Sequence, residues 1–228
     1  TSDYGCLATS AVTAVTVNAL PTATITPAGP TTFCFGGSVL LNANIGAGLS
    51  YVWKNNGAVI PGATTAAYLA VAIGNYQVVV TNANSCTQTS STTIVTVNPI
   101  PAVIINASGP LTFCDGSSVT LTSTGIPGYT YQWKKDGSNI SGAVSSSYTA
   151  TTTGSYTLYT TSEYNCSATS TPSAVTVNAL PTATITPATT TTFCSGGSVL
   201  LNANAGAGLS YAWKLNGSAI SGATTAAY

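Results

Sequence analysis

The six cysteines are the side chains in this sequence with the clearest capacity for chemistry. They form two sets, and within each set neighbouring cysteines are 80 residues apart: Cys34, Cys114 and Cys194, and Cys6, Cys86 and Cys166. Histidine is absent, so the usual partner of a zinc site or of a thiol nucleophile is missing. Six cysteines without histidine favour disulfides formed in an oxidising compartment. We therefore expect an extracellular or cell-surface protein.

Charged residues are too few for most other chemistry. The 228 residues include four Lys and four Asp or Glu, so the formal net charge is zero. Acid-base catalysis needs a group that titrates near neutral pH or two carboxylates brought together, and the acidic residues lie in different repeats or loops. Nucleic acid binding needs a basic face that neutralises several phosphates. We expect no enzyme activity, no cofactor, no metal site and no nucleic acid partner.

The sequence also lacks the marks of a membrane segment or a leader. No apolar run approaches the roughly 18 residues that a membrane helix needs, and there is neither a signal peptide nor a Met. We expect an internal piece of a longer protein, without a membrane span. Its surface can be hydrated by abundant Thr, Ser and Asn side chains, as is typical of exported proteins.

The chain consists of one module that recurs with a period of about 80 residues. Trp53, Trp133 and Trp213 recur in the same register as the cysteines. Residues 20–68 differ from residues 180–228 at only nine positions, whereas the middle repeat diverges much more. Two module types therefore alternate, so the longer period is two modules. We expect the C-terminal part of a repeat at 1–19, complete repeats at 20–99 and 100–179, and the N-terminal part of a further repeat at 180–228.

Alternation of constant and variable positions within each module predicts β-strands. In SVLLNAN and SVTLTST, the first and third apolar residues are kept while Leu40 is replaced by Thr120, so we expect Leu40 to point outward. Turn sequences such as Gly36-Gly37 and Pro61-Gly62 separate the strands at short, regular intervals. This spacing predicts an all-β fold, with tandem sandwich repeats arranged end to end and joined by short proline-containing linkers.

The module resembles an immunoglobulin-like domain. In that pattern a core Trp follows an apolar position by about a dozen residues, and a Tyr precedes a third core position by two. Here Trp53 follows Leu41, and Tyr76 precedes Val78, while both usual cysteine positions are apolar. The core residues predicted in this way are Trp53, Trp133, Trp213, Leu41, Leu121, Val78, Leu158, Tyr76 and Tyr156.

A finer resemblance comes from the motifs FCxGGSVxL, YxWKxxG and GxYxxxxT, followed by a Cys just past the last of them. This set resembles the Ig-like repeats of very large proteins exported by Bacteroidota, which are similar to those of gliding-motility adhesins and type IX secretion substrates. The resemblance covers the whole chain. It implies a structural repeat region of an extracellular stalk, fibre or adhesin that gives reach and stiffness, and it does not identify a ligand.

A second interpretation is that the repeats are themselves adhesive. They could associate with themselves, laterally or end to end, into a filament, or they could bind surface glycans. The residues that favour this interpretation are outward-facing side chains that only some repeats carry, namely Tyr4, Tyr164, Tyr159, Leu40 and Leu200. Scattered exposed apolar side chains are common in proteins, so the spacer remains the leading interpretation.

Strand geometry argues against a disulfide between Cys34 and Cys86 inside one repeat. Cys34 lies seven residues before Leu41, and Cys86 lies eight residues after Val78, on strands that run in the same direction. At about 3.3 Å per residue the two cysteines lie at opposite ends of the sandwich, whereas a disulfide needs Cα atoms within about 7 Å. When sandwiches stack end to end, the loop between strands A and B meets the F–G turn of the next repeat. This places Cys34 near Cys166, the favoured pair.

The same rule would join Cys114 to a cysteine beyond this sequence, and Cys6 and Cys86 to repeats upstream. Pairing within a repeat and free or interchain thiols remain open alternatives. In the favoured pattern each bond joins neighbouring repeats, so it would make the joint between them stiffer.

Overall fold

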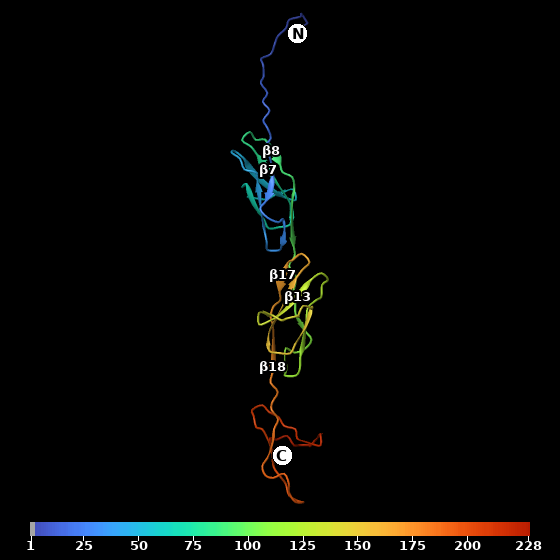
Figure 1. Cartoon of the computed structure of the whole chain (residues 1–228). Helices are drawn as coiled ribbons and strands as arrows, with labels where there is room; N and C mark the ends of the chain where they lie inside the picture. The colour runs from blue at the N-terminus through green and yellow to red at the C-terminus, as the bar shows by residue number, and fades with distance from the viewer. Residues whose placement is uncertain (1–2) are drawn as a thin grey trace. The chain divides into compact units, whose positions relative to one another are not determined.

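A computed structural model describes residues 3–228, and these form strands, turns and extended segments (Figure 1). No helix is present in this part of the chain, and so none that could cross a membrane. Contacts divide the chain into two compact units. One holds the residues up to Val103 together with Gly125–Gln132 and Leu158–Ser170, and the other holds Ile104–Thr124, Trp133–Thr157 and Thr171–Tyr228. The predicted all-β class is confirmed.

The first complete repeat folds into two sheets. The smaller sheet has the order β1-β3-β6 and is antiparallel, with β1 (Ile25–Pro27), β3 (Val39–Ala43) and β6 (Ala67–Ala70). The larger sheet has the order β2-β9-β7-β4-β5, with β2 (Thr32–Cys34), β9 (Thr93–Asn98), β7 (Gly74–Thr81), β4 (Ser50–Asn55) and β5 (Ala58–Val59). Strand β8 (Thr87–Thr89) also pairs with β7. Strands β3, β4 and β7 take the places of strands B, C and F of an immunoglobulin-like sandwich.

The second complete repeat repeats this topology. Its smaller sheet has the order β10-β12-β15, with β10 (Asn106–Ala107), β12 (Val119–Thr122) and β15 (Ser147–Ala150). Its larger sheet has the order β11-β18-β16-β13-β14, with β11 (Thr112–Cys114), β18 (Ser173–Asn178), β16 (Gly154–Thr161), β13 (Thr130–Lys135) and β14 (Ser138–Asn139). Strand β17 (Ser167–Thr169) pairs with β16. In both repeats one pair of strands is parallel, namely β2 with β9 and β11 with β18.

The core lies between the two sheets because every second side chain of a strand points the same way. In β3, Val39 and Leu41 are buried, while Leu40 between them is 40% exposed. The Trp53 indole is fully buried, and its Nε1 donates a hydrogen bond to the Thr65 carbonyl at 2.9 Å. The core residues predicted from the sequence all lie at 7% exposure or less: Trp53, Trp133, Trp213, Leu41, Leu121, Val78, Leu158, Tyr76 and Tyr156.

A buried tyrosine fixes the start of the F strand in each complete repeat. The Tyr76 hydroxyl donates to the Ala72 carbonyl at 2.9 Å, and the Tyr156 hydroxyl donates to the Thr152 carbonyl at the same distance. Each phenol therefore packs its ring in the core while its polar end is satisfied by the backbone four residues upstream. This is the tyrosine corner of immunoglobulin-like domains.

The flanking segments carry less sheet structure. Residues 3–19 are exposed and contain no strand. Residues 7–18 nevertheless occupy the positions of the repeat that form β8 and β9 in the first complete repeat. Residues 180–228 form two short pairs, β19 (Ile185–Pro187) with β20 (Leu201–Ala203) and β21 (Lys214–Leu215) with β22 (Ser218–Ala219). Trp213 is nevertheless 7% exposed and donates from Nε1 to the Thr225 carbonyl at 2.9 Å, as in the complete repeats.

Candidate functional site: a disulfide between neighbouring repeats

A disulfide joins the first complete repeat to the second. Cys34 and Cys166 are 132 residues apart in the sequence, and their Cα atoms lie 5.6 Å apart with an S–S distance of 2.00 Å. Both cysteines belong to the same compact unit. Cys86, the alternative partner within the first repeat, remains a thiol. The bonded pair is the one that the strand geometry favoured.

Cys34 is positioned by the edge of the larger sheet. It is the last residue of β2, which runs parallel to β9 so that Cys34 lies opposite Asn98. The Phe35 backbone N–H donates to the Asn98 carbonyl at 2.8 Å, and the Gly37 N–H donates to the Cys34 carbonyl at 2.9 Å. The expected position of Cys34 in a loop between strands A and B is wrong, because Cys34 ends a strand. The segment forms a strand because pairing with β9 satisfies its backbone polar groups.

Cys166 is positioned by the F–G turn, between β16 and β17. The Ser162 N–H donates to the Cys166 carbonyl at 2.8 Å, and the Cys166 N–H donates to the Ser162 Oγ at 3.3 Å. Asn165 has a φ of 59°, a left-handed conformation that Asn tolerates better than most residues. Cys166 is fully buried, and its Sγ lies 4.0 Å from the Asn98 carbonyl oxygen. The turn thus presents its sulfur to the end of β9 in the preceding repeat.

The first repeat contains the same arrangement around Cys86. The Cys86 Sγ lies 3.9 Å from the Asn18 carbonyl oxygen, as the Cys166 Sγ lies 4.0 Å from that of Asn98. Each contact spans 68 residues of sequence. At both places, therefore, the sulfur of the F–G turn lies close to the carbonyl oxygen of the equivalent asparagine in the preceding repeat.

The other half of the arrangement recurs at Cys114. Cys114 ends β11 and lies opposite Asn178 in β18, as Cys34 lies opposite Asn98. The Asp115 N–H donates to the Asn178 carbonyl at 2.8 Å, the counterpart of the bond from Phe35. Cys114 is an exposed thiol, and Cys6 and Cys194 are exposed as well.

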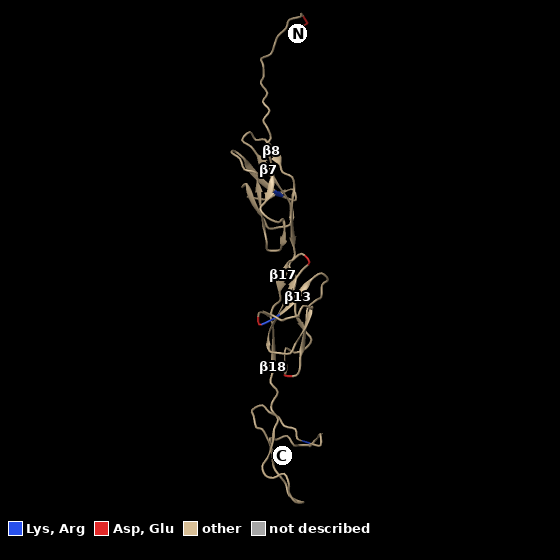
Figure 2. Ribbon diagram, viewed as in Figure 1, with Lys and Arg blue, Asp and Glu red and all other residues tan. Residues whose placement is uncertain are grey.

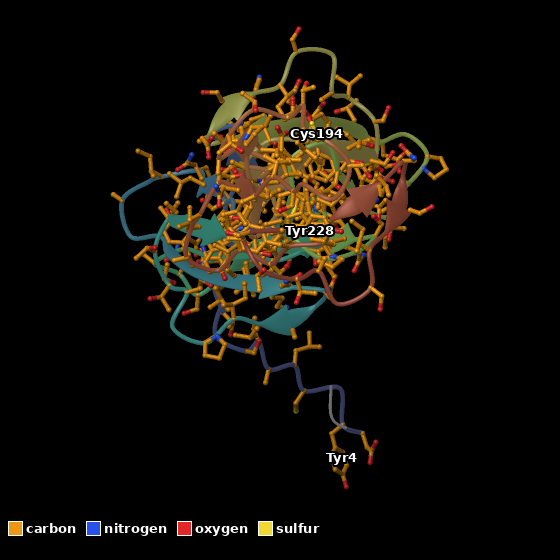
Figure 3. The ribbon with its side chains drawn as sticks, turned by 90° about the horizontal axis from the view of Figure 1, so that it is seen from below. Tyr4, Cys194 and Tyr228 are labelled. Carbon is orange, nitrogen blue, oxygen red and sulfur yellow. A yellow bond between two sulfur atoms is a disulfide. The ribbon has the colours of Figure 1, made fainter. Side chains whose placement is uncertain are left out.

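The structure distributes the five possible contact residues over separate segments. Tyr4 is 93% exposed in the N-terminal segment, and Figure 3 shows its ring extending from the chain. Tyr164 in the F–G turn is 55% exposed, whereas Tyr159 in β16 is half-buried. Leu40 in β3 and Leu200 just before β20 are 40% and 53% exposed. These side chains do not come from one strand or one turn.

Sequence reasoning missed two apolar surfaces of the first repeat. Leu69 in β6 is 53% exposed and lies directly opposite Leu40, so the two form a cross-strand pair on the outer face. Near Cys34, a hollow of about 460 Å³ is lined mostly by apolar residues that include Phe35, Val71 and Ile73. The outward direction of Leu69 could have been predicted from the sequence. The second repeat has Thr149 at the position of Leu69, just as it has Thr120 at the position of Leu40.

Charged side chains are sparse over the described chain, as Figure 2 shows. Lys135 donates from Nζ to the Thr152 Oγ1 at 2.8 Å, and Asp136 accepts from the Ser155 N–H at 2.8 Å. Both therefore support the turn at the start of β16. Among residues 3–228, no three His, Cys, Asp or Glu side chains gather in a group that could hold a metal ion.

Comparisons with known proteins give only structural likenesses. No family profile matches the sequence, and no curated protein sequence matches it. A titin I-band fragment, I67–I69, is similar with a TM-score of 0.45 and 14% identity over 88% of this chain and 86% of that chain. Three N-terminal domains of the bacteriophage RB49 outer capsid protein Hoc are similar with a TM-score of 0.36 and 18% identity, over 84% of this chain and 73% of that chain. Murine CEACAM1b is similar with a TM-score of 0.35 and 16% identity, over 70% of this chain and 100% of that chain.

Proposed function

We propose that the chain is a structural repeat region of an extracellular or cell-surface stalk, fibre or adhesin, stiffened at the joint between repeats. The observation that carries this proposal is the Cys34–Cys166 disulfide, which links the edge strand of one repeat to the F–G turn of the next. Disulfides form and persist in oxidising environments, which supports a location outside the cytosol. The immunoglobulin-like sandwiches supply length, and the disulfide supplies a second connection between them.

Two connections restrict a joint more than one. The backbone passes from Asn98 through Pro99 and Pro101 into the second repeat, and a linker of this length alone leaves domain motion as the default expectation. The disulfide adds an attachment at Cys34, on a different strand of the same sheet. Rotation about the linker would then have to break or distort the second attachment.

Electron microscopy of single molecules tests this role. In the oxidised chain we expect a narrow distribution of the angle between the two complete sandwiches, and in a Cys34→Ser/Cys166→Ser variant a broader one. Cys114→Ser is the matched control, because Cys114 occupies the same strand position in the second repeat but forms no bond. Equal distributions in all three proteins would show that the disulfide does not stiffen the joint.

The motif resemblance supports a more specific origin within this function. FCxGGSVxL, YxWKxxG and GxYxxxxT together resemble repeats of very large Bacteroidota proteins, so we assign the chain to an exported protein of the gliding-motility adhesin or type IX secretion substrate class. The complete coding sequence tests this assignment. A sorting domain of the type IX system at its C-terminus is the expected result, and a different export signal would contradict it.

Self-association is a second candidate, favoured by the cross-strand pair of Leu40 and Leu69. Two exposed leucines side by side offer an apolar patch that a second copy could cover. Analytical ultracentrifugation should show concentration-dependent association that a Leu40→Thr/Leu69→Thr variant loses, since Thr is the residue of the second repeat at both positions. Ile94→Ala is the control, because Ile94 is 64% exposed and lies on the other sheet. A parent chain that stays monomeric at high concentration would rule this candidate out.

Glycan binding is the other form of the adhesive interpretation. Tyr164 offers an exposed ring in the F–G turn, where aromatic faces can stack on sugars. A glycan array probed with the chain and with a Tyr164→Ala variant would detect such binding. Signal that the variant retains would exclude Tyr164 as the contact.

A further inference from the structure

The disulfide closes a covalent loop that contains most of both complete repeats. The loop runs from Cys34 to Cys166 along the backbone and returns through the S–S bond. Residues 35–165 lie inside it, and these include Trp53 and Trp133, the centres of both cores. Only short segments of each repeat lie outside the loop, namely 20–33 and 167–179.

We propose that this disulfide is a force-bypass device, through which a pulling force crosses two repeats without extending the chain that the covalent loop encloses. Tension applied at the two ends of the pair follows the shortest covalent path. That path runs from residue 20 to Cys34, across the S–S bond to Cys166, and on to residue 179. Residues 35–165 then cannot be drawn out, whether or not their sandwiches stay folded.

Four strands lie on the force path. Before the bond these are β1 and β2, and after it β17 and β18. Strand β2 pairs only with β9 and thus forms an edge of the larger sheet, and β1 is likewise an edge of the smaller sheet. Strand β18 lies between β11 and β16 and carries the buried Val175, so its detachment would open part of the second core. Hydrogen-bonded strands yield at lower force than a covalent bond, so detachment stops when the tension reaches the disulfide.

The length withheld from extension is large. At about 3.4 Å per residue, residues 35–165 correspond to roughly 450 Å of stretched chain, whereas the segments outside the loop supply only about 100 Å. A pair of repeats without the bond could extend through its whole contour as each core unfolds. With the bond, the extension ends after the segments outside the loop have been stretched.

This inference rests on the covalent connectivity and is independent of the stiffness proposed above. A joint that bends freely would still withhold residues 35–165 from tension, because bending leaves the S–S bond intact. Equal angle distributions in microscopy would therefore remove the stiffening role and leave the force bypass standing. Conversely, a stiff joint does not by itself imply that tension passes through the sulfur atoms.

Single-molecule force spectroscopy tests the proposal on the full chain, held by peptide-ligated handles at its two ends rather than through thiols. We expect the oxidised chain to show no release of the roughly 450 Å enclosed by the loop. The Cys34→Ser/Cys166→Ser variant should release that length in steps as the two cores unfold. Cys114→Ser should behave like the parent. Release of the enclosed length from the oxidised parent would overturn the proposal.

Reduction within a single tether provides a second measurement that does not depend on folding of the variant. Dithiothreitol breaks the S–S bond by thiol–disulfide exchange, leaving two thiols while it is itself oxidised to a cyclic disulfide. Adding it under tension should release about 450 Å from a molecule that had stopped extending. A release of only about 170 Å would correspond to a loop of residues 35–85, closed by Cys34 and Cys86, and would overturn the proposal. No release at all would do the same.

Discussion

The first and second complete repeats are alike inside and different outside. Leu41 and Trp53 of the first repeat and Leu121 and Trp133 of the second are all fully buried at equivalent positions. Between the sheets, therefore, the two sequences meet the same packing requirement. The difference lies on the alternate side chains, which the sandwich leaves in water.

The outer face of the smaller sheet shows the difference directly. In the first repeat Leu40 lies opposite Leu69, whereas in the second Thr120 lies opposite Thr149 with their Oγ1 atoms 3.5 Å apart. Either pair suits these strands, because the side chains that point into the core are the alternate ones and stay the same. The comparison indicates that the fold specifies the inner side chains of these strands, while the outer ones are available for interactions in which the two repeats can differ.

At one buried position the two repeats differ in polarity. Val80 in β7 is fully buried, and its counterpart in β16 is Thr160, which is 3% exposed. Among the residues that the structure describes, the Thr160 Oγ1 is buried without a hydrogen-bond partner. The second repeat thus carries an unsatisfied polar group in its core where the first carries a methyl group.

The largest effect should come from removing the shared core. Trp53→Ala and Trp133→Ala should each lower the free energy of unfolding by about 3 to 5 kcal/mol, because each indole is fully buried and leaves a cavity. Urea unfolding followed by circular dichroism measures the loss. Val52→Ala is the control on the same strand, since Val52 points outward and the third repeat has Ala212 there. Variants that unfold with the parent would show that the two cores are not centred on these residues.

A smaller effect should come from exchanging the buried position at which one repeat has an apolar and the other a polar side chain. Thr160→Val should raise the free energy of unfolding by about 1 kcal/mol, because it removes a buried hydroxyl without a partner. The reciprocal Val80→Thr should lower it by about 1 to 3 kcal/mol. Thermal melts of the two variants would give opposite shifts. Shifts of the same sign would mean that the surroundings of the two positions differ more than their burial suggests.

The smallest effect should appear at alkaline pH. Burial raises the pKa of the Tyr76 phenol, and neighbouring Tyr68 adds to this. In the second repeat burial raises the pKa of Tyr148, with a further contribution from Tyr156. The comparison therefore predicts one phenol in each repeat that resists ionisation.

The sign of the effect follows from linkage. In the unfolded chain a tyrosine ionises near pH 10, while in the folded chain these two stay protonated to higher pH. Their contribution to stability is complete below about pH 10 and is lost as pH rises through the folded pKa. Chemical denaturation at stepped pH should show a decline above about pH 10 that Tyr148→Phe makes shallower. An identical decline in this variant would contradict the assignment.

Much of the fold could be predicted because it is encoded locally. The alternation around Leu40 identified the inner face of β3, and the spacing of Trp53 and Tyr76 identified an immunoglobulin-like core. The short edge strand β2 was not predicted. A strand of this length carries too little alternation to signal itself, and β2 exists because β9, far along the sequence at Thr93–Asn98, offers its backbone a parallel partner.

For the disulfide, the sequence and the tertiary structure each determine a different part of the pairing. The sequence by itself determined that Cys34 and Cys86 end up at opposite ends of one sandwich, since the rise of a strand is fixed by its backbone. It left the partner of Cys34 open among a neighbouring repeat, its own repeat and another chain. Only the tertiary structure brings the Cys34 Cα within 5.6 Å of that of Cys166, because both are held against the Asn98 end of β9, one by strand pairing and the other by the F–G turn. Local periodicity specifies which way a side chain points, whereas the meeting of two sulfur atoms 132 residues apart depends on how complete sheets come together.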